Sequence, residues 1–157
     1  MSDQHTRDQL VNLLIEEQAH MSFENAVRRF PAAHINTRPP NVEYTFWHLI
    51  EHLRLTQWDI LDYIRNSHYQ AREWPREYWP TPDATTDAAG WQHTIDQFLN
   101  DRAALVAIVQ DPHTDLYSPI PHGYDGHTIL REILIVADHN AYHVGELGIL
   151  RQVVGIW

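Results

Sequence analysis

Apolar residues recur at helical spacing in four stretches of the chain, and each stretch carries its own start or stop signal. Pro31 closes the first stretch, and the Asp111-Pro112 pair closes the third. Thr45 and Thr128 directly precede the second and fourth stretches, where a threonine side chain suits the N-cap of a helix. The pattern therefore predicts helices over residues 8–30, 46–66, 86–110 and 129–154.

The connections between these helices show no clean alternation of apolar and polar residues, so no strand is expected. We predict an all-α single domain over residues 1–157, in which the four amphipathic helices form a four-helix bundle. The connection over residues 66–85 is long and rich in proline and aromatic residues, which is typical of a crossover or a functional loop. A crossover that runs the length of the bundle, with Trp74, Tyr78 and Trp79 packed on its outside, makes the second and third helices parallel.

The composition narrows the classes of function. The 157 residues include 21 acidic and 11 basic side chains, and the net charge of −10 disfavours binding to nucleic acid. The absence of cysteine excludes a disulfide framework, a thiolate nucleophile and a cysteine-ligated metal, and it fits a reducing cytoplasm. Charged residues interrupt the most apolar stretch and the first ten residues are polar, so we expect neither a membrane span nor a signal peptide.

Twelve histidines supply the unusual chemistry of this sequence. His139 and His143 are four residues apart in the fourth predicted helix, which places them on one face with β-carbons about 6 Å apart. The surrounding segment is apolar on nearly every side, so the pair is expected to be buried and to need partners. A shared metal ion is one such partner, although a pair of this kind also occurs on surfaces and in hydrogen-bonded cores.

The second predicted helix contributes a further pair, His48 and His52. Advancing each residue by about 100° places His52 near the apolar stripe and His48 further toward solvent. His52, His139 and His143 together would form a three-histidine site with an open position, the arrangement of a catalytic divalent metal.

Several neighbouring side chains are candidates for supporting roles. Glu132 and Glu146 project to the same side as the pair and are expected to orient the imidazoles from behind. His48 is expected to line the mouth of a pocket or to lie on the surface one turn from a ligand, rather than to be a fourth ligand. His20 falls with Glu17 and Glu24 on the inward stripe of the first helix and is a further pocket-lining candidate.

The remaining histidines lie outside these helical faces. Four residues of the loop before the last helix could cap the site, namely His113, His122, Tyr124 and His127. The others are expected to be solvated, and they are His5, His34, His68 and His93.

Three segments carry a family resemblance: TFWHLIEHLRLTQWDILDYI, YQAREWPREYWP and HTILREILIVADHNAYHVGELGILRQVVGIW. Together they resemble the DinB-like (DinB/YfiT) superfamily, across nearly the whole chain. The resemblance implies an up-down-down-up four-helix bundle that is often dimeric and holds a divalent metal through three histidines. His52, in the family's W-x-L-x-x-H context, matches the ligand of the second helix, while His139 and His143 match the H-x-x-x-H pair.

The resemblance implies a metal site more firmly than it implies a reaction, because relatives include thiol-dependent S-transferases, an isomerase and hydrolase-like enzymes. One hypothesis is a metal-dependent hydrolase or thiol S-transferase acting on a small molecule, with any low-molecular-weight thiol supplied as a cosubstrate. The alternatives are a non-catalytic metal or small-molecule binding module with a stress-response role, and a purely structural bundle. A di-iron centre is disfavoured because Glu17-x-x-His20 is the single E-x-x-H motif. Imidazole ligands suit zinc, nickel, copper and iron. Zinc and nickel are favoured as the ion, and iron, manganese and copper are the alternatives.

Two glycines and a tryptophan bear on assembly. Gly145 and Gly148 interrupt the last helix, where each costs about 1 kcal/mol relative to alanine, so a close approach by another segment or another subunit is expected. Trp58 falls nearly opposite the inward stripe of the second helix, beside Arg54, and would lie in solvent in a monomer. Together with the resemblance, these features predict a homodimer.

Overall fold

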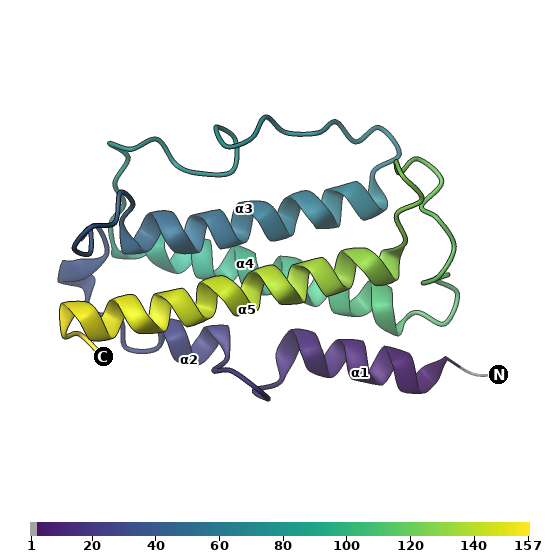
Figure 1. Cartoon of the computed structure of the whole chain (residues 1–157), viewed down its shortest axis with the longest axis horizontal. Coiled ribbons are helices and arrows are strands. Elements are labelled where there is room, and N and C mark those ends of the chain that lie inside the picture. The colour runs from purple at the N-terminus through teal and green to yellow at the C-terminus, as the bar shows by residue number, and fades with distance from the viewer. Residues whose placement is uncertain (1–2) are drawn as a thin grey trace.

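The computed structural model describes residues 3–157, and over that range its regular elements are all helical (Figure 1). The elements are α1 (Gln4–Ile15), α2 (Phe23–Val27), the 3-10 turn η1 (Ala32–His34), α3 (Phe46–Arg65), α4 (Ala88–Gln110) and α5 (Ile129–Val154). The expected all-α class is confirmed. No helix of residues 3–157 combines the length and the apolar character that a bilayer span requires.

The three longest helices begin where the sequence placed their caps. The Thr45 hydroxyl accepts a hydrogen bond from the backbone N–H of His48, and Thr128 accepts one from Arg131 in the same way. Asp87 caps α4 through the N–H of Gly90. Helix α5 ends at Gly155, whose φ of 75° lies in the left-handed region that glycine adopts freely.

The long helices lie side by side, with the crossover along their outside (Figure 1). In Figure 1, α3 and α4 begin at the same end of the molecule and run in the same direction, whereas α1 and α5 run the opposite way. α3 packs against both α4 and α5, and the segment over residues 66–85 returns past α3 to the start of α4. The middle of α3 therefore faces α5 on one side and has the crossover near its outer side.

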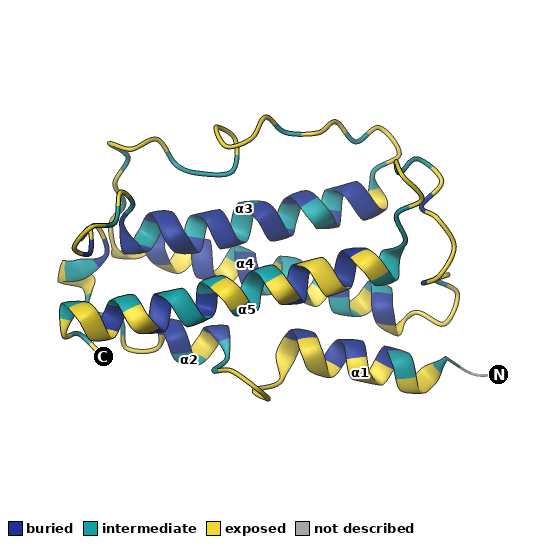
Figure 2. Cartoon of the chain, in the orientation of Figure 1, coloured by how far each residue is buried: buried dark blue, intermediate teal, exposed yellow. Residues whose placement is uncertain are grey.

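Figure 2 shows that α3 is buried along most of its length, while buried and exposed residues alternate along α5. The core has two parts. One part gathers α1 with the later half of α3 and includes Leu10, Leu61, Leu105 and Ile133. The other gathers α2 with the earlier half of α3 and includes Phe23, Phe46, Leu53, Phe98 and Leu147.

The prediction of one continuous helix over residues 8–30 was wrong. Helix α1 ends at Ile15, residues 16–22 are not helical, and α2 begins at Phe23. The Ser22 hydroxyl accepts from the N–H of Asn25, and the Glu17 carboxylate accepts from the side-chain amide of Asn25. These polar groups cap a new helix and compete with continuation of the old one. The angular count loses its phase at the break, so Glu17, His20 and Glu24 are exposed rather than inward.

The expectations for the glycines and Trp58 had mixed outcomes. A β-carbon at Gly148 would lie 2.9 Å from Cε of Met21, so a close approach exists within the chain. A β-carbon at Gly145 would meet no described atom within 4 Å apart from its chain neighbours and the backbone of its own helix. Trp58 is half-buried, and the guanidinium of Arg72 from the crossover lies 4.5 Å from its ring centre, so the prediction that it lies in solvent was wrong.

Candidate metal centre

His52, His139 and His143 come together between the middle of α3 and the middle of α5. One ring nitrogen of each lies within 4.8 Å of the others, and within residues 3–157 no other set of three histidines or carboxylates meets this criterion. The ring centres of His52 lie 5.0 Å from His139 and 4.9 Å from His143. The sequence had identified all three side chains, and the fold brings them to one point.

A backbone carbonyl of the crossover fixes the tautomer of His52. Nδ1 of this ring lies 2.8 Å from the carbonyl oxygen of Tyr78. A carbonyl oxygen only accepts hydrogen bonds, so Nδ1 carries the proton and Nε2 of the neutral ring keeps its lone pair.

A carboxylate fixes the same tautomer in His143, with the proton on Nδ1. Nδ1 of His143 donates to Oε2 of Glu146 at 2.6 Å, and the Tyr44 hydroxyl donates to Oε1 of the same carboxylate. Burial opposes ionisation of Glu146, but these two hydrogen bonds outweigh it and hold the pKa of the carboxyl below its usual value. Glu146 therefore supports His143 from behind, as the sequence predicted.

A threonine hydroxyl completes the set. Oγ1 of Thr56 donates its single proton to the backbone carbonyl of His52 at 2.8 Å, and it lies 3.3 Å from Nδ1 of His139. With that proton engaged, Oγ1 accepts from Nδ1–H of His139. All three rings then carry their proton on Nδ1, and their three Nε2 lone pairs remain free.

The free nitrogens of His52 and His139 face each other at 3.2 Å. Two lone pairs at this separation repel unless a cation or a proton lies between them. Burial is the main cause that lowers the pKa of His52 to about 4 and that of His139 to about 3, and a second positive charge is also unfavourable in this cluster of rings. Both rings are therefore neutral near pH 7, which is the protonation state that a metal ligand requires.

The three rings line a cavity of about 550 Å³. Trp79 of the crossover stacks on His52 with ring centres 3.9 Å apart and planes only 7° apart. Asp59 of α3, whose side chain is nearly buried, accepts hydrogen bonds from the hydroxyls of Tyr78 at 2.7 Å and Tyr69 at 3.1 Å. No sequence signal pointed to the roles of Tyr44, Thr56 and Asp59, because each depends on a contact between distant segments.

The prediction that His48 turns toward solvent was wrong. Its side chain is buried, with 2% of the residue exposed, because the crossover covers this face of α3. Its Nε2 lies 2.8 Å from the carbonyl oxygen of Ala84 and donates to it. His48 lines a separate hollow on the other side of Trp79 and does not join the three-histidine cluster.

The supporting role expected for Glu132 was also wrong. This buried carboxylate accepts from Arg131 at 2.5 Å and lies 3.4 Å from Nδ1 of His127. It shares a helix face with His139 but precedes it by seven residues, about 10 Å along the axis. An angular count gives the direction of a side chain around the axis and does not give this distance.

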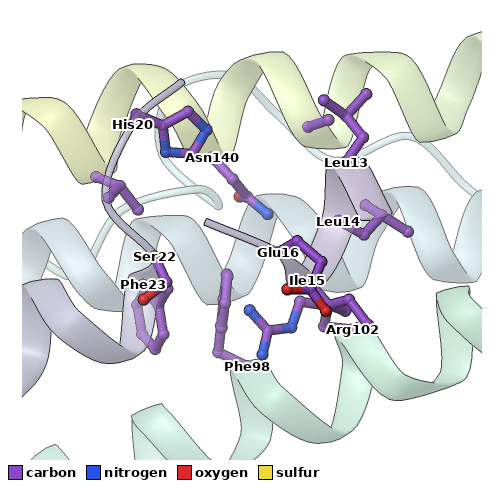
Figure 3. Close-up of a pocket in the computed structure, with 12 residues that line it drawn as sticks. Leu13, Leu14, Ile15, Glu16, His20, Ser22, Phe23, Phe98, Arg102 and Asn140 are labelled. Atoms are coloured by element: carbon purple, nitrogen blue, oxygen red, sulfur yellow. The ribbon is translucent and has the colours of Figure 1, made fainter. Parts of the chain in front are cut away.

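His20 lines a different hollow from the one expected. Figure 3 shows it beside Asn140 at the break between α1 and α2. The cavity there has a volume of about 30 Å³ and is also lined by Phe98 and Arg102. Its own ring is exposed, with Nδ1 2.7 Å from the carbonyl oxygen of Met21. His20 therefore does not line the cavity of the three histidines.

The loop residues proposed to cap the site lie elsewhere. His122 donates from Nε2 to the carbonyl of Tyr63 at 2.7 Å, and His127 lies 3.3 Å from the Tyr63 hydroxyl. The backbone N–H of Tyr124 donates to that hydroxyl as well. These side chains pack on the later end of α3, and His113 is exposed.

Comparison with known proteins places the chain in a family. No curated protein and no solved structure matches it at a significant level. The model of the DinB superfamily matches residues 16–147, a range that includes the three clustered histidines, Glu146 and the crossover. The chain therefore belongs to the DinB superfamily.

Proposed function

We propose that this protein binds one divalent metal ion through Nε2 of His52, His139 and His143, and that it is a metal-dependent enzyme acting on a small molecule. The observation that carries the proposal is the convergence of one ring nitrogen from each of the three histidines beside an open cavity of about 550 Å³. Each ring is held by a separate group on Nδ1, so the donor set is pre-organised for a cation.

A divalent ion held by three imidazoles retains an open position and lowers the pKa of a water or thiol that binds there. The residues of the chain have simpler tasks. Glu146 and the Tyr78 carbonyl orient two of the rings, and Trp79 shields one face of His52 from water. Hydrolysis and thiol S-transfer both use this chemistry, and a thiol would come from a low-molecular-weight cosubstrate because the chain has no cysteine.

The cavity favours an enzyme over the alternative, a non-catalytic binding module. A site that only stores a metal is usually closed by a fourth protein ligand. His48 is the nearest further histidine along α3, and its Nε2 is engaged by the Ala84 carbonyl instead. Zinc and nickel are the favoured ions, followed by iron, manganese and copper, since the imidazole donors suit several of them.

Metal analysis tests the proposal directly. Protein purified without a nickel column and then offered Zn²⁺ or Ni²⁺ should retain about one ion per chain after desalting. Retention near zero for every divalent ion offered would overturn the proposed site. Catalysis is then tested with the loaded protein on panels of ester and thiol-transfer substrates, and the same assays on metal-free protein should show background rates only.

We also propose an up-down-down-up bundle and a homodimer. The directions of α1, α3, α4 and α5 in Figure 1 support the bundle order.

Support for the dimer comes from α5, where Ile149 and Val153 are 63% and 58% exposed beside the open space at Gly145. Light scattering coupled to size exclusion decides the assembly, because a mass near the 18.4 kDa of one chain would exclude a dimer at that concentration.

A further inference from the structure

Exposed apolar side chains gather at the cavity of the three histidines. Trp74 from the crossover is 67% exposed, and Tyr142 and Ile135 from α5 are 72% and 40% exposed. All three line this cavity, although they come from two segments far apart in the sequence. Large apolar groups left in water around a concave site mark a place where a ligand covers them.

The residues on the inner wall of this cavity also present mainly apolar surface. Trp79 lies flat against His52, and the Tyr78 hydroxyl is engaged by Asp59, so Tyr78 contributes its ring to the cavity. The Thr56 hydroxyl is engaged by backbone carbonyls and by His139. These walls therefore offer a ligand few free hydrogen-bond donors beyond the histidines.

The charge of the lining points to an uncharged ligand body. Apart from the three histidines, Asp59 is the one acidic or basic side chain among the residues that line the cavity. Arg72 lies 3.7 Å from Asp59 and stacks on Trp58, which directs its guanidinium to groups of the protein. Away from the metal, an anionic body would meet Asp59 and aromatic rings here, and the lining contains no lysine or arginine to pair with it.

We infer that the ligand of this cavity is a small aromatic molecule with one metal-directed donor atom and an uncharged ring body. The inference rests on the proposed metal site and adds the substrate class. The donor atom lies at the histidines, and the ring lies between Trp74 and Tyr78 of the crossover and Ile135 and Tyr142 of α5, where ring-on-ring contacts add to the burial of apolar area. The cavity volume is within the range of known small-molecule sites.

Three probes that share one donor group test this inference. Imidazole, 4-phenylimidazole and 4-phenylimidazole with a para-carboxylate are titrated into metal-loaded protein, and binding is followed by calorimetry. The phenyl ring should tighten binding at least tenfold over imidazole, which corresponds to about 1.4 kcal/mol. The carboxylate should remove most of that gain. Equal affinities for imidazole and 4-phenylimidazole would overturn the inference, and tight binding of the carboxylate would overturn its charge component.

Matched variants locate the ring. Trp74→Ala and Ile135→Ala should each lower the phenyl preference about threefold or more while leaving the affinity for imidazole unchanged. Leu134→Ala is the control, because Leu134 neighbours Ile135, is 46% exposed and does not line the cavity. An equal effect of Leu134→Ala would place the ring elsewhere and overturn the inference.

The metal content of each sample separates the two proposals. Protein that holds metal and shows no phenyl preference contradicts the substrate class alone. Protein that holds no metal contradicts the proposed function, and the same titrations then report on the walls alone. In that case a phenyl preference that Trp74→Ala abolishes retains the aromatic site, and equal weak binding of both probes removes it.

Discussion

Two groups of histidines contact α3, one near its middle and one near its later end, and their surroundings differ. Near the middle of α3 and α5, His52, His139 and His143 present their free nitrogens to one another beside a cavity. Near the start of α5, His122 and His127 gather around Tyr63, and each binds a neighbour from its own chain. Histidine content alone does not distinguish these groups, since both are partly buried and both contact aromatic rings.

The difference lies in which ring nitrogen the protein engages. In the central group the Tyr78 carbonyl, Thr56 and Glu146 all engage Nδ1, and the three Nε2 atoms converge. In the group near Tyr63, His122 engages the Tyr63 carbonyl through Nε2, whereas His127 contacts the Tyr63 hydroxyl through Nδ1, and neither is among the residues that line the described cavities. A metal site therefore requires both a common tautomer and room for the ion, and the central group alone has both.

The largest expected effect comes from removing a central histidine. His52→Ala, His139→Ala or His143→Ala should each reduce metal occupancy to a small fraction of the wild-type level, because two imidazoles hold a divalent ion far less tightly than three. His48→Ala and His127→Ala are the controls, since each removes a histidine whose ring contacts other groups, and both should retain metal. Metal analysis after dialysis against a weak chelator measures all five. Unchanged occupancy in His139→Ala would eliminate the site.

Substituting the residues that hydrogen-bond to the metal-binding histidines should reduce metal affinity by a smaller amount. Glu146→Gln removes the charge that polarises His143, and loss of such a partner typically lowers metal affinity about 10- to 100-fold. Tyr44→Phe removes one hydrogen bond to the same carboxylate and should weaken the affinity less. Competition with a chromogenic chelator gives both dissociation constants.

Glu132→Gln provides the matched control on the same helix. Glu132 accepts a hydrogen bond from Arg131 and contacts no ring of the central group. The metal affinity of the Glu132→Gln variant should therefore equal that of the wild type. A loss equal to that of Glu146→Gln would show that the effect arises from the net charge of α5 and not from the contact with His143.

Much of the fold could be predicted because its determinants are local. Thr45, Asp87 and Thr128 start helices through contacts with residues three positions further on, which a sequence reveals. The break over residues 16–22 was missed because Glu17 and Asn25 interact across the break, and the apolar periodicity continues on both sides of it.

The same distinction between local determinants and distant contacts holds for the site. His139 and His143 share a helix face, and the phase of α3 turns His52 toward them, so all three could be identified from periodicity. The burial of His48 and the stacking of Trp79 depend on the path of the crossover, which has no periodic signal. Glu132 and Glu146 have similar angular positions, and only their distance along α5 from the pair distinguishes them.

Acidification should weaken the metal's contribution to stability. Histidine ligands must be neutral, and the folded-state pKa values of about 4 for His52 and about 3 for His139 keep these two rings neutral until the pH approaches 4. A chelator should therefore lower the melting temperature clearly at pH 7.5 and by a smaller amount near pH 4. A protein shown to hold metal, yet insensitive to chelator at pH 7.5, would contradict this account.

The metal-free protein should be acid-sensitive for a related reason. Burial lowers the folded-state pKa of His52 to about 4 and of His139 to about 3, below the value of 6.5 in the unfolded chain. Between these values the unfolded state binds more protons, so the free energy of unfolding falls as the pH falls from 6.5 toward 3. A double variant with His52→Gln and His139→Gln should lose less stability between pH 7.5 and pH 5 than the metal-free wild type.

The smallest effect is expected at the other histidine group, where a substitution should change stability and leave metal binding unchanged. His127→Ala removes a contact of 3.3 Å with the Tyr63 hydroxyl, and a hydrogen bond of this kind contributes about 0.5–1.5 kcal/mol. Tyr63→Phe should destabilise more, because it also leaves the N–H of Tyr124 without its acceptor. Urea denaturation with and without metal separates the two contributions. Both variants should keep the wild-type increment on adding metal, and a reduced increment in His127→Ala would mean that the two groups are coupled through α5.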